Sequence, residues 1–271
     1  FEWRFGNIYY TKKGTGSPIL LIHDTLPGAS GYEWSKIEDE LAIDHTVYTV
    51  DLLGCGRSDK SSITYTNFVY VQMISDFIKK IIGQKTDVIA SGFSGSFVTM
   101  ACHNEKELFN KIMLVNPPSL TQLKQMPNRK DRLLKAALEI PIFGTLVYHM
   151  IVSRDNINNL FIEKMYYNPF HVDNQMADAY YEAAHKGGYY TRFLYSSLAA
   201  KYININICHA LKALDNSIYI VEGETEPNGK AVTDDYCASN PAIEVSVLKE
   251  TKHLPHVEAP EAFLEQVKIF F

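Results

Sequence analysis

The stretch Asp87–Ala90, which reads DVIA, continues into Ser91-Gly92-Phe93-Ser94-Gly95-Ser96 and then into a helical pattern. A short apolar run followed by small residues and a helix predicts a buried strand with a sharp turn after it. A serine on such a turn has a strained backbone, and only small neighbours fit around it. Glycines lie two residues before Ser94 and one residue after it, although a serine replaces the final glycine of the usual GxSxG pattern. We therefore interpret Ser94 as a nucleophile; the alternative is a loop that only caps the helix.

Strand and helix patterns alternate on both sides of this turn. After an opening hairpin at residues 1–11, the predicted strands are Ile19–Ile22, His45–Leu52, Asp87–Ala90, Lys111–Val115, Ser217–Val221 and Glu244–Leu248. This alternation predicts an α/β fold with a mostly parallel central sheet flanked by helices. From about Ser119 to Asp215 the pattern is helical, without a convincing strand. We therefore expect a core of residues 1–118 and 216–271 with an inserted helical cap at 119–215.

Composition excludes several classes of protein. The chain has 271 residues, of which 46% are hydrophobic and 21% charged, as expected for one large globular domain. A formal net charge of −5, with no run of more than two basic residues, argues against a nucleic-acid partner. No run approaches the length of a membrane-spanning helix, so we expect no such segment. The four cysteines lack CxxC spacing, which argues against a thiolate metal site and a disulfide scaffold.

Two segments near the C-terminus supply a candidate base and a candidate acid. The loop Lys252–Pro260, which reads KHLPHVEAP, places His253 after the last predicted strand, and histidine suits proton transfer to and from a serine. The segment Val221–Pro227, which reads VEGETEP, places Glu226 where a carboxylate would orient the imidazole. The chain order is then Ser, Glu, His. The alternative acids are Asp234, Asp235 and Glu224.

A third segment, Leu21–Gly28, reads LIHDTLPG and begins at the end of the predicted strand Ile19–Ile22. A tetrahedral intermediate needs two preorganised N–H donors. We predict that the backbone N–H groups of Thr25 and Gly95 form this oxyanion hole. All these segments follow parallel strands, whose carboxyl ends meet at the edge of an open sheet where sites are built.

Together these motifs resemble the α/β-hydrolase fold superfamily, in the serine hydrolase branch that carries a helical cap. The segment Asp51–Asp59, DLLGCGRSD, is similar to a structural turn of that family, DxxGxGxS. The resemblance covers the core; the cap matches in position and helical character only. It implies a serine hydrolase, a carboxylesterase above all, that forms an acyl-enzyme through Ser94, His253 and Glu226. One departure is Asp24, where the family usually has glycine, because a carboxylate there would oppose a developing oxyanion.

The predicted cap is rich in tyrosine, which suggests a pocket that is apolar with polar tips. The candidate pocket residues are Asp24, Phe93, Tyr148, Tyr189 and Leu254. We expect a small, largely apolar acyl substrate and no cofactor. His253 and His256 lack the spacing of a metal site, so no metal is expected, and His256 is predicted to pack below the catalytic loop.

Two other functions remain open. The stretch Pro27–Gly31, PGASG, resembles the members that hydrolyse C–C bonds of diketone-like compounds. Asp24 and Ser96 instead favour a ligand-binding or receptor-like protein on the same scaffold, with little turnover. We expect a cytoplasmic protein whose partner is a small molecule. The alternative is a protein with a signal or a membrane anchor in a segment upstream of Phe1. The sequence does not indicate an oligomeric state.

Overall fold

A seven-stranded sheet lies at the centre of the molecule, and the computed structural model describes residues 1–271. In spatial order the strands are β3 (Tyr10–Lys13), β5 (His45–Val50), β4 (Ser17–Ile22), β6 (Thr86–Ser91), β7 (Phe109–Val115), β8 (Ile218–Gly223) and β9 (Glu244–Leu248). Every neighbouring pair is parallel except β3 with β5. A separate short hairpin joins β1 (Glu2–Trp3) and β2 (Gly6–Asn7). The predicted α/β fold with a mostly parallel sheet is confirmed.

Alternate residues of the central strands face two different hydrophobic cores. In β4, Leu20 and Ile22 belong to a cluster of 37 buried residues, whereas Ile19 and Leu21 belong to a cluster of 14. Because both faces are covered, the strands read as continuous apolar runs. The helices α2 (Asn67–Phe77), α3 (Ser94–Asn104) and α11 (Gly229–Ser239) contribute to the larger cluster, and α1 (Glu38–Leu41) and α13 (Pro260–Phe270) contribute to the smaller one.

Several helices of the core begin or end in a short element of another helical type. A 3-10 turn, η1 (Gly31–Trp34), precedes α1. Helix α2 continues as η2 (Ile78–Ile82) and ends at Gly83, whose φ of +74° makes it a left-handed glycine C-cap. Two short elements, η3 (Lys106–Leu108) before β7 and α12 (Pro255–Glu258) before α13, complete the core.

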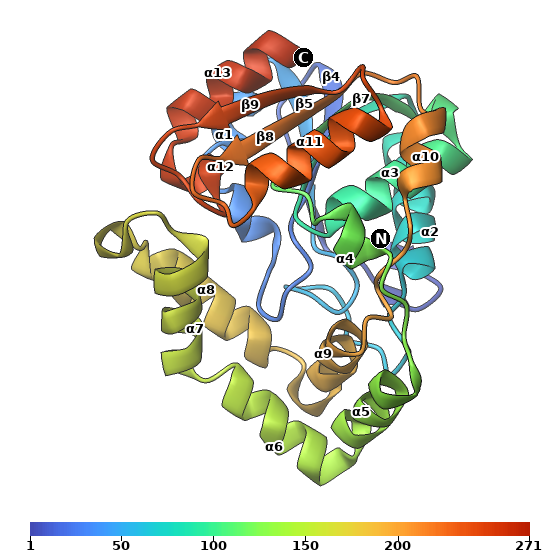
Figure 1. The fold of residues 1–271 in the computed structure, drawn as a ribbon, viewed down its shortest axis with the longest axis vertical. Coiled ribbons are helices and arrows are strands. Elements are labelled where there is room, and N and C mark those ends of the chain that lie inside the picture. Colours follow the sequence, from blue (N-terminus) through green and yellow to red (C-terminus); the bar gives the residue numbers. More distant parts are fainter.

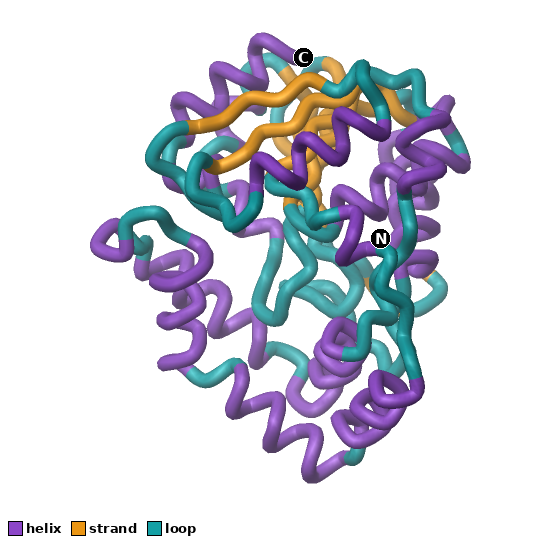
Figure 2. Tube along the Cα trace, viewed as in Figure 1, coloured by secondary structure: helices purple, strands orange, loops and turns teal.

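Between β7 and β8 the chain forms helices and no strand. In order these are α4 (Leu120–Leu123), α5 (Arg129–Glu139), α6 (Pro141–Ile151), α7 (Arg154–Leu160), η4 (Phe161–Met165), η5 (Pro169–His171), α8 (Asn174–His185), η6 (Gly188–Thr191), α9 (Arg192–Ala199) and α10 (Cys208–Ala213). Helices α4 and α10 pack against core helices α11 and α3. Helices α5 to α9 form an arc that faces the carboxyl ends of the strands (Figure 1), and the strands are confined to the other half of the molecule (Figure 2).

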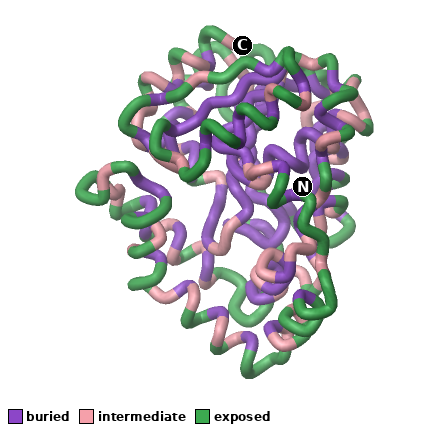
Figure 3. The backbone as a smooth tube through the Cα atoms, in the orientation of Figure 1, coloured by how far each residue is buried: buried purple, intermediate pink, exposed green.

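A third cluster of 13 buried residues joins this arc to the core. It contains Tyr148 of α6 and Tyr180 of α8 together with Ala29 and Leu254 from the loops at the strand ends. Buried residues are concentrated in the central strands β5, β4, β6, β7 and β8 and are sparse in α5 and α6 (Figure 3). No single helix is long and apolar enough to cross a bilayer; α5 and α6 reach that length and composition only together, with a bend of 96° between them.

Candidate active site

The turn after β6 lies at Gly92. Strand β6 extends through Ser91, which is paired with Val115 of β7, and the next residue has a φ of +53°. The following residue, Phe93, is already right-handed helical, and α3 begins at Ser94. Glycine takes a left-handed conformation without a steric penalty, so the chain turns there. The predicted position of the strained turn was therefore wrong by two residues, and Gly92 occupies the place at which this type of turn presents a nucleophile.

Ser94 lies in the first turn of α3 and is fully buried. Its hydroxyl donates a hydrogen bond of 2.5 Å to the carbonyl oxygen of His23 and lies 3.4 Å from the Thr25 hydroxyl. It makes no hydrogen bond with His253. The structure thus does not bring the predicted nucleophile and base together.

His253 and Glu226 do meet, at the ends of segments that are 27 residues apart in sequence. The Nδ1 atom of His253 lies 3.2 Å from Oε1 of Glu226, and its Nε2 atom lies 3.3 Å from Oδ2 of Asp24. Burial alone would lower the pKa of His253, but the hydrogen bonds to Asp24 and Glu226 outweigh it and raise this pKa to about 10. The imidazole is therefore a cation between two carboxylates at neutral pH.

The second oxygen of Asp24 occupies a backbone N–H pair. Its Oδ1 atom accepts hydrogen bonds from the N–H of Thr25 at 2.6 Å and from the N–H of Phe93 at 2.8 Å. Two N–H groups that converge on one oxygen have the geometry of an oxyanion hole. The predicted donor Gly95 is not one of them, because its N–H donates to the carbonyl of Gly92 within the turn. Its place is taken by Phe93, the residue that follows Gly92.

Asp24 fills the space that a side chain at position 92 would need. A Cβ atom built on Gly92 would collide with the carboxylate of Asp24. The carboxylate and a side chain at position 92 therefore exclude each other. Asp24 is able to occupy this space because the residue at the turn is glycine, which has no side chain to act as a nucleophile.

Glu33 is a buried carboxylate that the sequence analysis missed, and it contacts the backbone of Asp24. Glu33 accepts a hydrogen bond of 3.3 Å from the backbone N–H of Asp24 and one of 3.4 Å from the hydroxyl of Tyr180. Burial would raise the pKa of Glu33, but His256, whose Nε2 atom lies 3.2 Å away, lowers it. His256 is fully buried and stacks on Trp34, so its predicted place below the loop is confirmed.

Asn116 is the second residue that the sequence analysis missed. It has a φ of +43° at the end of β7. Its side-chain nitrogen donates to the carbonyls of Lys252 at 2.8 Å and His253 at 2.9 Å, and its oxygen accepts the N–H of Gly223 at 3.0 Å. One amide thus ties the ends of β7 and β8 to the loop that carries His253. Its only sequence signal is Asn-Pro-Pro at the end of a strand.

A cavity of about 510 Å³ opens beside His253. Of the predicted pocket residues, Asp24 and Phe93 line it. Tyr148, Tyr189 and Leu254 do not: the Tyr148 hydroxyl donates to the carbonyl of Ala184, Tyr189 is exposed, and Leu254 is buried in the third cluster. The aromatic side chains of the inserted helices mostly pack against one another, which is the usual use of tyrosine in a small helical layer.

Two carboxylates in this cavity have oxygens without a partner. Glu222, at the end of β8, is only 5% exposed, and neither its Oε2 atom nor the Oε2 atom of Glu226 forms a hydrogen bond. Burial raises the pKa of Glu222, and the nearby charge of Glu226 adds to this effect. Buried polar atoms are normally hydrogen-bonded, so two unpartnered oxygens on side chains that line one cavity leave capacity there to accept further hydrogen bonds.

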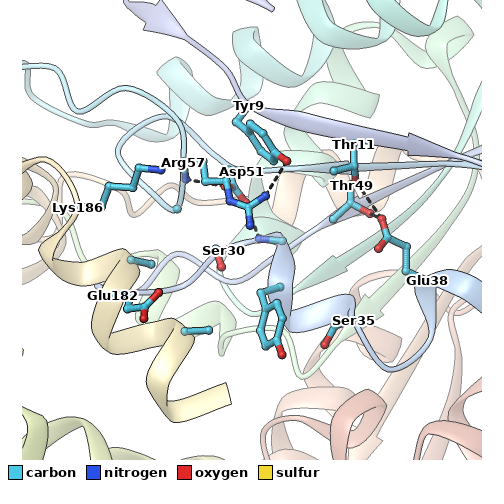
Figure 4. A pocket seen from close by; sticks show the side chains of 15 residues that line it. Tyr9, Thr11, Ser30, Ser35, Glu38, Thr49, Asp51, Arg57, Glu182 and Lys186 are labelled. Carbon is cyan, nitrogen blue, oxygen red and sulfur yellow. Dashed lines mark hydrogen bonds between the residues drawn. The ribbon is translucent and has the colours of Figure 1, made fainter. Parts of the chain in front are cut away.

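A second cavity, of about 250 Å³, lies apart from His253 and is shown in Figure 4. Its base is the Asp51 turn, where the carboxylate of Asp51 accepts the backbone N–H groups of Gly31 and Arg57, each at 2.6 Å. The Arg57 side chain donates to the Tyr9 hydroxyl, and the other wall contains Glu182 of α8 and Lys186, which follows that helix (Figure 4). These bonds account for the conformation of the turn.

Comparison with known proteins places the chain in a family. The profile of the alpha/beta hydrolase family matches residues 19–266, which is most of the chain. The protein is a member of the α/β-hydrolase family. The predicted resemblance to the α/β-hydrolase superfamily is thereby confirmed.

Individual relatives of this α/β-hydrolase differ in activity. A 2-hydroxy-6-oxo-6-(2'-aminophenyl)hexa-2,4-dienoic acid hydrolase from Metapseudomonas resinovorans is 29% identical over 113 residues, which span 41% of this chain and only 39% of that relative. A solved meta-cleavage product hydrolase from Pseudomonas fluorescens IP01 matches with a TM-score of 0.78 and 19% identity over 98% of this chain and 94% of its own. An epoxide hydrolase, CorEH, matches with a TM-score of 0.81 and 16% identity over 100% of this chain and 96% of its own. The solved structures share the fold.

Proposed function

We propose that this α/β-hydrolase binds a small molecule beside His253 and does not form an acyl-enzyme at Ser94. The observation that carries the proposal is the pair of Gly92 and Asp24. Glycine stands at the turn that would present a nucleophile, and a carboxylate of the chain itself occupies the backbone N–H pair that would stabilise an oxyanion. Both features oppose acyl transfer at its first step.

The state of His253 supports the same proposal. A general base needs a free lone pair at the operating pH. Both ring nitrogens of His253 face carboxylate oxygens, and its pKa is raised to about 10, so the ring already carries both protons at neutral pH. In this state the imidazole is a fixed positive group and not a proton acceptor.

The cavity favours a ligand with an apolar body and a hydrogen-bond-donating group, such as a protonated amine. Leu26, Pro117 and Met165 supply apolar walls. The side chains of Glu222 and Glu226 line the cavity, and their unpartnered oxygens, which are buried, would accept hydrogen bonds from the donor group after a side-chain rotation. An ammonium group would also offset the excess of carboxylates over cations around His253.

A fluorophosphonate probe tests the absence of an acyl-enzyme. We expect the intact, folded protein to remain unlabelled, because the Ser94 hydroxyl is buried and bonded to the His23 carbonyl. The Ser94→Ala variant is the matched control. Labelling of the wild type that disappears in this variant would establish a serine nucleophile and overturn the proposal.

Binding of benzylamine, compared with its neutral analogue benzyl alcohol, tests the ligand class. At a concentration tenfold above Kd, a ligand stabilises the folded state by about 1.4 kcal/mol. We expect benzylamine to raise Tm more than benzyl alcohol does, and Glu222→Gln to remove the difference. If benzyl alcohol binds as well as benzylamine, the cavity binds small molecules but the amine preference is wrong.

A serine hydrolase of small acyl compounds, carboxylic esters first and C–C bonds of diketone-like compounds second, is the other candidate function. The hydrogen bond between His253 and Glu226 favours it, as does the Thr25 and Phe93 N–H pair, because both are parts of a hydrolase site. This function requires Asp24 to leave the N–H pair and Ser94 to reach His253. Turnover of short-chain p-nitrophenyl esters that Ser94→Ala abolishes would favour it.

A further inference from the structure

The outer face of α5 and α6 is apolar and exposed. In α6, Ile142, Leu146 and Met150 are spaced by four residues, so they lie along one side of the helix, and they are 78%, 61% and 70% exposed. We call the whole surface the α5–α6 patch; it consists of Leu133, Leu134, Ile140, Ile142, Phe143, Leu146 and Met150, all of them exposed. Singly exposed apolar side chains are normal on a protein surface, but seven within residues 133–150 are a concentration that indicates an interaction site.

Basic side chains flank the patch at the start of α5. Arg129, Lys130 and Arg132 are exposed, and none of them takes part in an ion pair, whereas Asp131 is buried and caps the helix with Asn128. Cations in the first turn of a helix oppose the helix dipole, so helix stability does not explain their position. The chain as a whole has a net charge of −5, which makes this local positive charge distinctive.

We propose that the α5–α6 patch docks the protein on the surface of an anionic lipid membrane. Exposed leucine, isoleucine and phenylalanine beside arginine and lysine are the composition of helices that lie in a membrane interface. The 96° bend places two short helices at a corner of the molecule, far from the sheet (Figure 1), where both outer faces are free. A second copy of the chain fits less well, because a symmetric contact uses the same patch on both copies and so supplies no anionic surface for the basic residues.

Sedimentation with vesicles tests this proposal. We expect the protein to bind vesicles of phosphatidylcholine with phosphatidylglycerol, and to bind pure phosphatidylcholine vesicles much more weakly. Phe143→Glu and Leu146→Glu should each weaken binding by about tenfold or more, because an apolar contact is replaced by a charge. Arg132→Gln should weaken it by about fivefold and reduce its dependence on salt.

Ile269→Glu is the matched control, because Ile269 is 74% exposed on α13, at the far end of the molecule. It should bind vesicles as the wild type does, and Tm measurements should show that all variants are folded. Two results would overturn the proposal. One is equal vesicle binding, or none, for wild type and patch variants. The other is a dimer in solution that Phe143→Glu dissociates, which would assign the patch to a second copy.

Discussion

At the scale of single residues, Asp24 and Gly92 decide the chemistry of the site. The carboxylate of Asp24 is bonded to two backbone N–H groups and to the imidazole of His253, so its position is fixed by three contacts. It is able to take this position only because position 92 has no side chain. Gly92 therefore leaves the turn without a nucleophile. Asp24 contacts the two backbone N–H groups and the imidazole that would have assisted a nucleophile.

Gly92→Ser should destabilise the protein by roughly 2–4 kcal/mol, because it adds a Cβ in a left-handed conformation and against the Asp24 carboxylate. Asp24→Gly in the same chain should recover part of this loss, with a coupling of about 1 kcal/mol or more in a double-mutant cycle. Urea unfolding of the four proteins measures both quantities. The double variant, and neither single variant, should react with a fluorophosphonate at position 92; purely additive stabilities would contradict the steric argument.

The raised pKa of His253 makes stability depend on pH in a defined window. The pKa is about 10 in the folded protein and near its ordinary value of 6.5 in the unfolded chain. The contribution of the His253 charge to the unfolding free energy is therefore fully present below pH 6.5 and is lost as the pH rises toward 10. We expect the unfolding free energy of the wild type to fall by up to a few kcal/mol between pH 6.5 and 10, and that of His253→Gln to change less. An NMR titration that places the pKa of His253 near 6.5 would refute this.

At the scale of elements, Asn116 holds three strand-end segments together. Its side chain joins the end of β7 to Gly223 of β8 and to the loop of Lys252 and His253. The site residues come from separate loops, so their relative positions depend on such cross-links rather than on any one strand. The left-handed φ of Asn116 suits this residue, because asparagine tolerates that region better than most side chains do.

Asn116→Ala should cost roughly 2–3 kcal/mol, since three backbone groups lose their partner. It should also lower the pKa of His253 toward 6.5, because the loop would no longer hold the imidazole between its two carboxylates. Urea unfolding and an NMR titration measure these two effects. Asn110→Ala is the control: Asn110 is exposed and bonds to Asp87 at the far end of the sheet, so its loss should change stability by less than about 1 kcal/mol and leave His253 unaffected.

At the scale of the whole molecule, the inserted helices are attached unevenly. Helix α8 buries Met176, Ala177, Tyr180 and Ala184, and Tyr180 also bonds to Glu33 of the core. Helices α5 and α6 each bury only two residues. Helix α8 is thus firmly packed on the core, whereas α5 and α6, which carry the exposed patch, bury few side chains.

Amide hydrogen exchange should follow this difference. We expect the central strands to exchange slowest and α5 and α6 about tenfold or more faster than α8, because elements with few buried contacts open most easily. Exchange followed by mass spectrometry on peptides from each helix measures the order. Anionic vesicles should slow exchange in α5 and α6 and not in α13, and equal protection of α6 and α8 without vesicles would contradict the packing argument.

The sequence by itself determined the architecture of this protein. Buried strands such as Ile19–Ile22 are continuous apolar runs because both faces of the sheet are covered, and helices follow them in the regular order of a parallel sheet. The meeting of Glu226 and His253 also followed from sequence, since both come directly after parallel strands that end at one edge.

Only the tertiary structure decided which residue of Ser91–Ser96 forms the turn. The segment Ser91–Ser96 contains two glycines and three serines. Local propensity therefore allows the turn at Gly92 as well as at Ser94. Pairing of Ser91 with Val115 extends β6 by one residue and places the left-handed φ on Gly92. The position of Asp24 is a consequence of that register, because its carboxylate, 68 residues away from Gly92 in sequence, fits only where the turn has no side chain.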